Sequence, residues 1–250
     1  MNPRVRVGVF LGAATAAAVF FAWGATGLPS FGHYPGPYGD EVIRAAVRDR
    51  HATNAVTTVV MDIRAVDTAG EELILFAAAV GVIMLLRRQR GERLVPPPVF
   101  AGGRHPVPPS NPVRVVSAAL IAPAALLGWY LVGHGQLTPG GGFQGGVVLA
   151  VPSALIFLAA RIRSFERLHP GLRWEIGQAV AIAAFLGVGF AGLVTSSAFL
   201  ANMLPFGTTG TVYSAGTIPV LNVIAGPAVA TAIVLVVIEL LEQLTEVRAK

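Results

Sequence analysis

The chain of 250 residues contains no cysteine and few charged residues. The lack of cysteine excludes disulfide bonds, thiolate metal sites and cysteine nucleophiles. Charged side chains make up 12% of the chain, which is about half the share that is usual in a soluble domain. Apolar residues make up 54%, and the mean hydropathy is +0.67. This composition excludes a disordered chain and is atypical of a soluble domain.

Three long stretches of the chain have no Asp, Glu, Lys or Arg, namely residues 7–39, 115–160 and 176–238. A membrane-spanning helix needs roughly 20 mostly apolar residues, and glycine and proline divide the two longer stretches. The sequence therefore predicts an all-α, polytopic membrane protein with six transmembrane helices, two and then four, and an outer amphipathic segment. The predicted spans are residues 7–27, 68–86, 113–133, 143–161, 176–198 and 219–240.

The remaining charges are distributed unevenly between the ends of the predicted spans. If the N-terminus is cytoplasmic, most Arg and Lys residues fall on the cytoplasmic side, in agreement with the positive-inside rule. The connections at 134–142 and 199–218 then lie outside and have neither Lys nor Arg. We therefore expect a multi-pass protein of the cell membrane with both termini in the cytoplasm. The net charge of +5 then reflects topology and does not indicate nucleic-acid binding. The alternative for residues 1–27 is a cleaved signal peptide.

A proline-rich segment at 91–112 divides the chain into two parts. It has seven prolines in 22 residues, which is incompatible with a helix and favours an extended connector. We therefore predict a two-span domain at 1–90, a cytoplasmic linker at 91–112 and a four-span domain at 113–250. A fusion of two smaller membrane proteins would explain this organisation, and a long loop within one protein is the alternative.

Two short helices are predicted between the first and second spans. Asp40 is the expected cap of a helix over residues 40–50. Apolar residues recur at helical spacing over residues 52–63, with polar residues largely on the other side. This pattern indicates an amphipathic helix that lies on the outer surface or packs against its neighbours.

Acidic residues next to the second span are the candidates for ion movement. Carboxylates at membrane depth are costly and usually functional, so Glu71 is a candidate for ion translocation. The alternative is an interfacial acid at a helix start, where Asp67 or Thr68 would cap the helix, and for Glu72 we favour this interpretation. An ion-paired turn, or alternatively an ion entrance, is expected for Asp62, Arg64 and Asp67.

The strongest local signal is the run TPGGGFQGG at residues 138–146. It matches GxGxxG formally, but a dinucleotide site requires a strand before this motif, and here a predicted span precedes it. The structural interpretation is that the glycines permit unusual backbone torsions and allow another helix to approach closely. Non-helical backbone at membrane depth is tolerated only against protein or a water-filled cavity. The residues of interest are Pro139, Gly140, Gly141, Gly142, Phe143, Gln144, Gly145 and Gly146.

The other polar residues in or beside the spans have simpler explanations. His134 is typical of an interfacial side chain, with a proton relay as the alternative. Asn202 and Asn222 suit hydrogen bonds between helices, and Glu239 is interpreted as solvated. The sequence shows no Ser–His–Asp order, metal-ligand cluster or pair of catalytic acids, so we predict no catalytic residues, no metal site and no cofactor.

Three segments carry a resemblance to the Mrp-type multisubunit Na+/H+ antiporters. The four-span part resembles their B-type component (MnhB/MrpB family) through GHGQLTPGGGFQGGVVLA at 133–150 and LPFGTTGTVYSAGTIPVLNVIAG at 204–226. The segment TNAVTTVVMDIRAVDTAGEELILFAAAVGVIMLLR at 53–87 resembles the C-terminal end of their large A-type component. That piece is equivalent to a small subunit of membrane-bound hydrogenases (MbhE-like). The resemblance covers nearly the whole chain.

The resemblance implies a non-enzymatic subunit of a complex that exchanges cytoplasmic Na+ for external H+. Its implied partners are the large A-type and D-type components, the small C-, E-, F- and G-type components, and the lipid bilayer, without nucleic acid. The acid of the family's DTxGE segment, which is implicated in ion translocation, maps onto Glu71. The important positions of the B-type component map onto Pro139 and Phe143. Gln136 stands where many relatives have histidine, and residues 225–233 lack a charge that relatives often carry, which implies that the four-span part is mainly scaffold.

Two other classes of protein remain as alternatives. A membrane subunit of an energy-converting hydrogenase-type or complex-I-like complex would leave its redox centres to its partners. A stand-alone channel or transporter is the other alternative, although the predicted spans have few charges at membrane depth and no internal repeat. The identity of the partner proteins would separate these alternatives.

Overall fold

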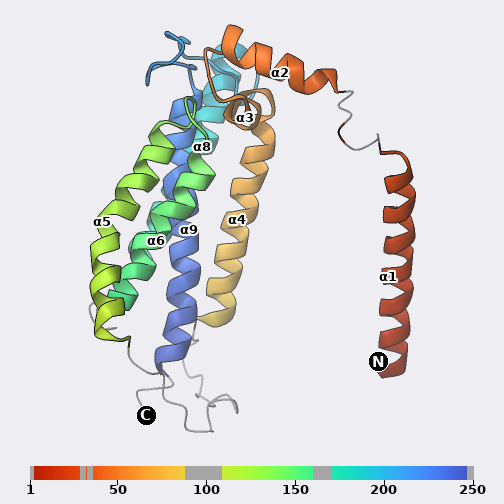
Figure 1. The fold of residues 1–250 in the computed structure, drawn as a ribbon, viewed down its shortest axis with the longest axis vertical. Coiled ribbons are helices and arrows are strands. Elements are labelled where there is room, and N and C mark those ends of the chain that lie inside the picture. The colour runs from red at the N-terminus through yellow and green to blue at the C-terminus, as the bar shows by residue number, and fades with distance from the viewer. Residues whose placement is uncertain (1–2, 29–31, 33–35, 88–108, 160–170, 247–250) are drawn as a thin grey trace. The chain divides into compact units, whose positions relative to one another are not determined.

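The computed structural model describes residues 3–28, 32, 36–87, 109–159 and 171–246, and Figure 1 shows their helices. Most of the predicted linker lies outside the described residues, so its expected extended form is not observed. Many of the basic residues that predict the topology also lie outside the described residues: Arg88, Arg90, Arg93, Arg104, Arg161, Arg163, Arg167, Arg248 and Lys250.

Six helices among the described residues are long and apolar enough to cross a membrane. They are α1 (Pro3–Thr26), α4 (Ala65–Leu86), α5 (Asn111–Gly133), α6 (Gly142–Ala159), α8 (Gly171–Ser196) and α9 (Ile218–Glu246). The described residues form no strand. The prediction of an all-α polytopic membrane protein is therefore confirmed, because each long uncharged run of the sequence forms one or two apolar helices of spanning length.

The chain divides into two compact units, residues 1–41 and 42–250. In the first unit, the described residues of α1 are exposed along the whole helix. The helix α2 (Pro37–Arg48) crosses the boundary, and its residues Val42 and Ala46 are buried. Because α2 begins at Pro37, Asp40 lies in its first turn, and the prediction that Asp40 caps this helix is wrong. An acid in the first turn is favourable because of the helix dipole.

In the second unit, α9 is the central helix and packs against α4, α5, α6 and α8 (Figure 1). Its core includes Phe185 of α8, Leu221 and Ala225 of α9, and Ala69 of α4. The helix α4 of the predicted two-span domain therefore shares one apolar core with the predicted four-span domain. This shared core is why the second compact unit begins at Val42 and not at the proline-rich linker.

Three glycines bring α6 very close to its neighbours. A Cβ atom on Gly142 or on Gly146 would lie 2.6 Å from an atom of α9. A Cβ atom on Gly145 would overlap Cγ2 of Val132 in α5. Since no side chain fits at these positions, the GFQGG run sets the spacing of three helices.

The segment before α4 is not the single amphipathic helix that the sequence predicts. It forms the short helix α3 (Ala55–Thr58), which continues as the π-helix η1 (Val59–Ile63). Asn54 caps α3, because its Oδ1 accepts hydrogen bonds from the backbone N–H groups of Val56 (3.1 Å) and Thr57 (3.3 Å). A π-helical turn is uncommon and frequently marks a functional site.

The helix α4 begins at Ala65, three residues earlier than predicted. Arg64 holds its cap position without a side-chain bond, so the prediction of a cap at Asp67 or Thr68 is wrong. The hydroxyl of Thr68 instead donates a hydrogen bond to the carbonyl oxygen of Val60 (2.5 Å) and ties α4 to η1. The earlier start moves the acids that follow about 4.5 Å further into the helix, at 1.5 Å for each of the three residues.

Candidate functional site

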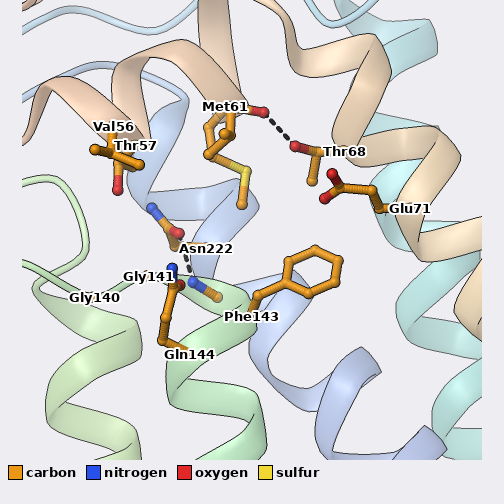
Figure 2. A pocket seen from close by; sticks show the side chains of 12 residues that line it. Val56, Thr57, Met61, Thr68, Glu71, Gly140, Gly141, Phe143, Gln144 and Asn222 are labelled. Atoms are coloured by element: carbon orange, nitrogen blue, oxygen red, sulfur yellow. Dashed lines mark hydrogen bonds between the residues drawn. The ribbon is translucent and has the colours of Figure 1, made fainter. Parts of the chain in front are cut away.

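A cavity of about 90 Å³ lies where α3, η1, α4, α6 and α9 meet (Figure 2). This volume has room for a few water molecules, at roughly 30 Å³ each. The cavity joins segments that are far apart in the sequence and come from both predicted domains. Its lining residues are Val56, Thr57, Val60, Met61, Thr68, Glu71, Gly140, Gly141, Gly142, Phe143, Gln144 and Asn222.

Glu71 is the acidic residue among those that line the cavity. Figure 2 shows its carboxylate beside Thr68 and on the same side of the cavity as Phe143. The residue is also exposed at the surface of its unit, so it faces both the cavity and the outside of the bundle. A carboxylate at this depth in a span is costly against lipid, and the cavity provides it with a site that water can fill.

Asn222 holds the glycine-rich wall of the cavity in place. This residue is fully buried in α9, and its Oδ1 accepts a hydrogen bond of 2.7 Å from the backbone N–H of Gly142. Its Nδ2 donates to the carbonyl oxygen of Ile218 (3.2 Å). Gly140 and Gly141 have φ angles of +148° and +134°, which other residues rarely adopt. The wall thus requires glycine for its backbone and asparagine for its anchor.

Three other predicted residues of this run differ in position. Phe143 and Gln144 line the cavity, whereas Pro139 is exposed and is not part of its wall. Gln136, at the position where many relatives have histidine, is fully buried. Its Nε2 donates a hydrogen bond to the carbonyl oxygen of Val212 (2.9 Å), so this glutamine connects two of the segments between spans.

Asn54 joins the two predicted domains, a role that sequence reasoning missed. Its Nδ2 donates to the carbonyl oxygens of Gly135 (2.8 Å) and Thr138 (2.9 Å), which lie between α5 and α6. The backbone N–H groups of Thr53 and Asn54 both donate to the carbonyl oxygen of Gln136 (3.1 Å). An asparagine directly before a helix signals a cap, but its contacts with a segment 81 residues away require the tertiary structure.

Glu72 is only 2% exposed, and neither of its carboxylate oxygens has a hydrogen-bond partner among the described residues. It shares a buried face of α4 with Ala65, Thr68 and Ala69, and α4 packs against α8 and α9. The interpretation of Glu72 as an interfacial acid is therefore wrong. Because α4 starts early, both acids lie inside the helix and not at its first residues. Successive residues are rotated by 100° about the helix axis, so Glu72 and Glu71 lie on different faces of α4.

Asp62, Arg64 and Asp67 do not form one group. Asp62 lies 2.8 Å from Nε of Arg50 as an ion pair and accepts a hydrogen bond of 2.8 Å from Nδ2 of Asn202. Arg64 and Asp67 form an ion pair with each other at the surface. None of the three lines the cavity, and Asp62 acts as an anchor between η1 and the segment that follows α8.

The opposite end of α4 has a different electrostatic arrangement. Arg87 donates hydrogen bonds to Oε1 of Glu175 (2.6 Å) and to Oε1 of Glu239 (2.6 and 3.1 Å). Glu239 is 2% exposed, so its interpretation as solvated is wrong. The hydrogen bonds from Arg87 to Glu175 and Glu239 raise the pKa of Arg87 above its usual value. This charged cluster fastens α4 to α8 and α9.

These features define an integral membrane protein that has a carboxylate-lined cavity between its spans. Residues 112–235 match the family model described as a domain related to the MnhB subunit of Na+/H+ antiporter. This match confirms the resemblance to Mrp-type antiporter components over these residues.

A curated relative from Rhizobium meliloti (strain 1021) is named as the A/B subunit of a probable K(+)/H(+) antiporter. It is 30% identical over 182 residues, which cover 64% of this chain and 18% of the relative. The chain thus spans less than a fifth of the length of this relative.

Two solved structures are similar to almost the whole chain. One chain of the membrane-bound sulfane sulfur reductase, an archaeal respiratory membrane complex, is 26% identical with a TM-score of 0.67. The match covers 95% of this chain and 98% of that one. A chain of the Mrp complex from Dietzia sp. DQ12-45-1b is 25% identical with a TM-score of 0.69, and the match covers 94% of this chain and 26% of that one. The same arrangement therefore occurs both as a nearly complete chain and as a quarter of a longer chain.

Proposed function

We propose that this chain is a membrane subunit of a multisubunit antiporter that exchanges a monovalent cation for protons. The family description names Na+ and the name of the relative gives K+, and both names support a monovalent cation as the exchanged ion. In this role the chain is a component of a secondary transporter, without catalytic residues or a cofactor of its own.

The cavity at Glu71 is the observation that supports this proposal most strongly. A carboxylate can take up and release a proton, and the cavity beside it has room for water. We assign Glu71 to the ion pathway of the complex. The glycine run and Asn222 then have a structural role, because they build the wall that keeps this cavity open between α4 and α6.

The two-part organisation of the chain belongs to the same proposal. We assign residues 1–90 to a piece like the C-terminal end of the large A-type component (MbhE-like), residues 91–112 to a linker and residues 113–250 to the B-type component. The name of the relative, which joins A and B, supports this assignment. The structural matches support it as well, because they extend through both parts.

The orientation and the partners follow from the same assignment. We place the protein in the cell membrane with both termini in the cytoplasm, because most basic residues then lie inside. The cavity lies toward the external side, and Arg64 and Asp67 are the exposed charges beside the proposed ion entrance there, with Asp62 as their anchored neighbour. The partners are the large A-type and D-type components and the small C-, E-, F- and G-type components.

Purification of the complex in mild detergent, followed by measurement of proton flux, tests the proposal. Everted vesicles from a host without its own antiporters would receive Na+, K+ or Li+, and a fluorescent dye would report the internal pH. We expect proton flux with at least one of these cations, and only when all subunits are present. A complete complex that shows no cation-dependent flux would contradict the proposed function.

One observation favours a second candidate function. The match in the sulfane sulfur reductase covers nearly the whole of one chain of a respiratory complex. A membrane subunit of such an energy-converting complex would have the same fold. Partner proteins that carry cysteine-bound redox centres would favour this candidate, and partners that are all antiporter-like would favour the first.

A further inference from the structure

The buried carboxyl group of Glu72 has no assigned role, although burial makes it costly. A carboxylate that is removed from water and receives no hydrogen bond strongly disfavours the charged form. Both oxygens of Glu72 are in this situation among the described residues. The structure therefore favours a neutral, protonated Glu72 in the interior of the bundle.

The surroundings of Glu72 contain no cation, among the described residues, that could balance a negative charge. Residues 176–238, which form most of α8 and α9, have no charged side chain. On η1, Asp62 is occupied by Arg50, and Arg87 at the far end of α4 is occupied by Glu175 and Glu239. The remaining charged groups on the elements packed around Glu72 are Asp67 and Glu71 on α4 itself, Arg173 at the start of α8, and Glu242 and Glu246 at the end of α9. Arg173 lies in the same helix turn as Glu175, at the Arg87 end of α4.

Glu72 lies next to the cavity, although it does not line it. Thr68 precedes both glutamates by one helical turn, is buried and lines the cavity. Residues three and four positions apart are neighbours on a helix surface, so the turn that contains Thr68 connects Glu72 to the cavity where Glu71 lies. Two adjacent carboxyl groups interact as a pair, and a negative charge on one disfavours a negative charge on the other.

We propose that Glu72 is a second proton-binding site of this protein, enclosed in the bundle behind Glu71, and that the pair carries one negative charge at a time. When Glu71 is charged, Glu72 holds its proton. When Glu71 becomes protonated, the O–H bond of Glu72 can break, and the proton passes to water in the cavity. A later proton from the same water restores the neutral acid. The part of this inference that concerns ion exchange rests on the proposed function, whereas the protonated state of Glu72 does not.

Infrared difference spectroscopy of the purified complex tests the protonated state directly. A protonated carboxylic acid has a carbonyl stretching band that shifts when H₂O is replaced by D₂O. We expect such a band in the wild-type complex and its loss in Glu72→Gln. In Glu71→Gln we expect a weaker band, because this glutamine mimics protonated Glu71 and allows Glu72 to release its proton. Asp49→Asn, on the exposed segment after α2, is the control for the loss of an unrelated carboxylate. An unchanged spectrum in Glu72→Gln would overturn the proposal.

Proton flux in vesicles tests the role of this site in exchange. Glu72→Gln has the shape of the protonated acid but cannot release a proton, so we expect flux to fall by roughly 10²-fold, as for the loss of a positioned proton-transfer group. Glu72→Asp keeps an acid and should retain a larger part of the flux. Wild-type flux in Glu72→Gln would overturn the role in exchange.

The outcomes for the two proposals are distinguishable. Absence of flux in the wild type would contradict the proposed function and leave the infrared result to decide the protonated state. If Glu72→Gln fails to assemble, the infrared band and flux of Glu72→Asp decide the question, and a wild-type band position in that variant would overturn the proposal.

Discussion

Two buried glutamates in this protein have opposite surroundings. Glu72 in α4 has no hydrogen-bond partner among the described residues, whereas Oε1 of Glu239 in α9 accepts two hydrogen bonds from Arg87. Both residues are 2% exposed, so burial does not distinguish them. The partnered glutamate fastens three helices, and the unpartnered one lies beside a cavity that has room for water. We infer that the Arg87 end of the bundle serves stability and the cavity end serves ion movement.

Replacement of the cavity acid should have the largest effect. We expect Glu71→Gln to abolish cation-dependent proton flux, because the variant cannot exchange a proton, while the complex still assembles. Flux in vesicles and recovery of the intact complex measure the two effects. Full flux in Glu71→Gln would show that this residue is not part of the ion pathway. It would also contradict the inference that the cavity end of the bundle serves ion movement.

Overpacking of the cavity wall should affect both assembly and flux. We expect Gly142→Leu to destabilise the protein by about 3 kcal/mol, because overpacking a close contact usually costs that much or less. Thermal stability and yield of the complex measure this effect. Gly187→Leu in α8 is the matched control, since a Cβ atom there meets nothing within 4 Å. Equal stability of the two variants would contradict the proposed role of the glycine run.

Removal of the cation at the other end should reduce stability without removing flux. We expect Arg87→Met to cost about 2 kcal/mol, less than a fully buried pair because Arg87 is partly exposed. The double variant Arg87→Met, Glu239→Gln should recover part of the loss, because it no longer buries an unpaired charge. Thermal unfolding of the complex measures both variants. Loss of flux in a stable Arg87→Met complex would contradict the inference that the Arg87 end of the bundle serves stability and not ion movement.

Removal of the asparagine that joins the two parts should have the smallest of these effects. We expect Asn54→Ala to cost about 1.5 kcal/mol in all, through the lost cap and the lost bonds to residues 135 and 138. Thr211→Ala is the control, because its hydroxyl donates only within an exposed turn. A shift in thermal stability that is no larger than that of the control would show that Asn54 does not join the two parts.

The fold could be predicted from the sequence because spanning helices depend mainly on composition. Uncharged runs of about 20 residues leave few other possibilities, and the six spans follow from them. The burial of Glu72 could not be predicted, because it depends on which face of α4 packs against α8 and α9. Glu71 and Glu72 are adjacent in the sequence, but the rotation of 100° per residue leaves the first exposed and the second buried.

The cavity itself depends on tertiary structure. The sequence identifies Glu71, the glycine run and Asn222 as separate features. Glu71 is an acid near a span, the glycines allow close helix packing, and Asn222 suits a hydrogen bond between helices. Their convergence requires segments that are about 70 and 80 residues apart to meet, and periodicity has no information on such distant contacts. The role of Asn54 could not be predicted for the same reason, since a cap can be recognised locally but its second set of acceptors cannot.

The hydrogen bonds that join residues 53–54 to residues 135–138 bear on how the sequences of such proteins can diverge. The donors at Thr53 and Asn54 all reach backbone carbonyl oxygens of residues 135–138. Backbone acceptors are present whatever side chains the segment carries. As far as these bonds are concerned, a substitution in residues 135–138 needs no compensating change at Thr53 or Asn54. Relatives that share only about a quarter of their residues can in this way keep the same junction, whether the two parts belong to a short chain or to a long one.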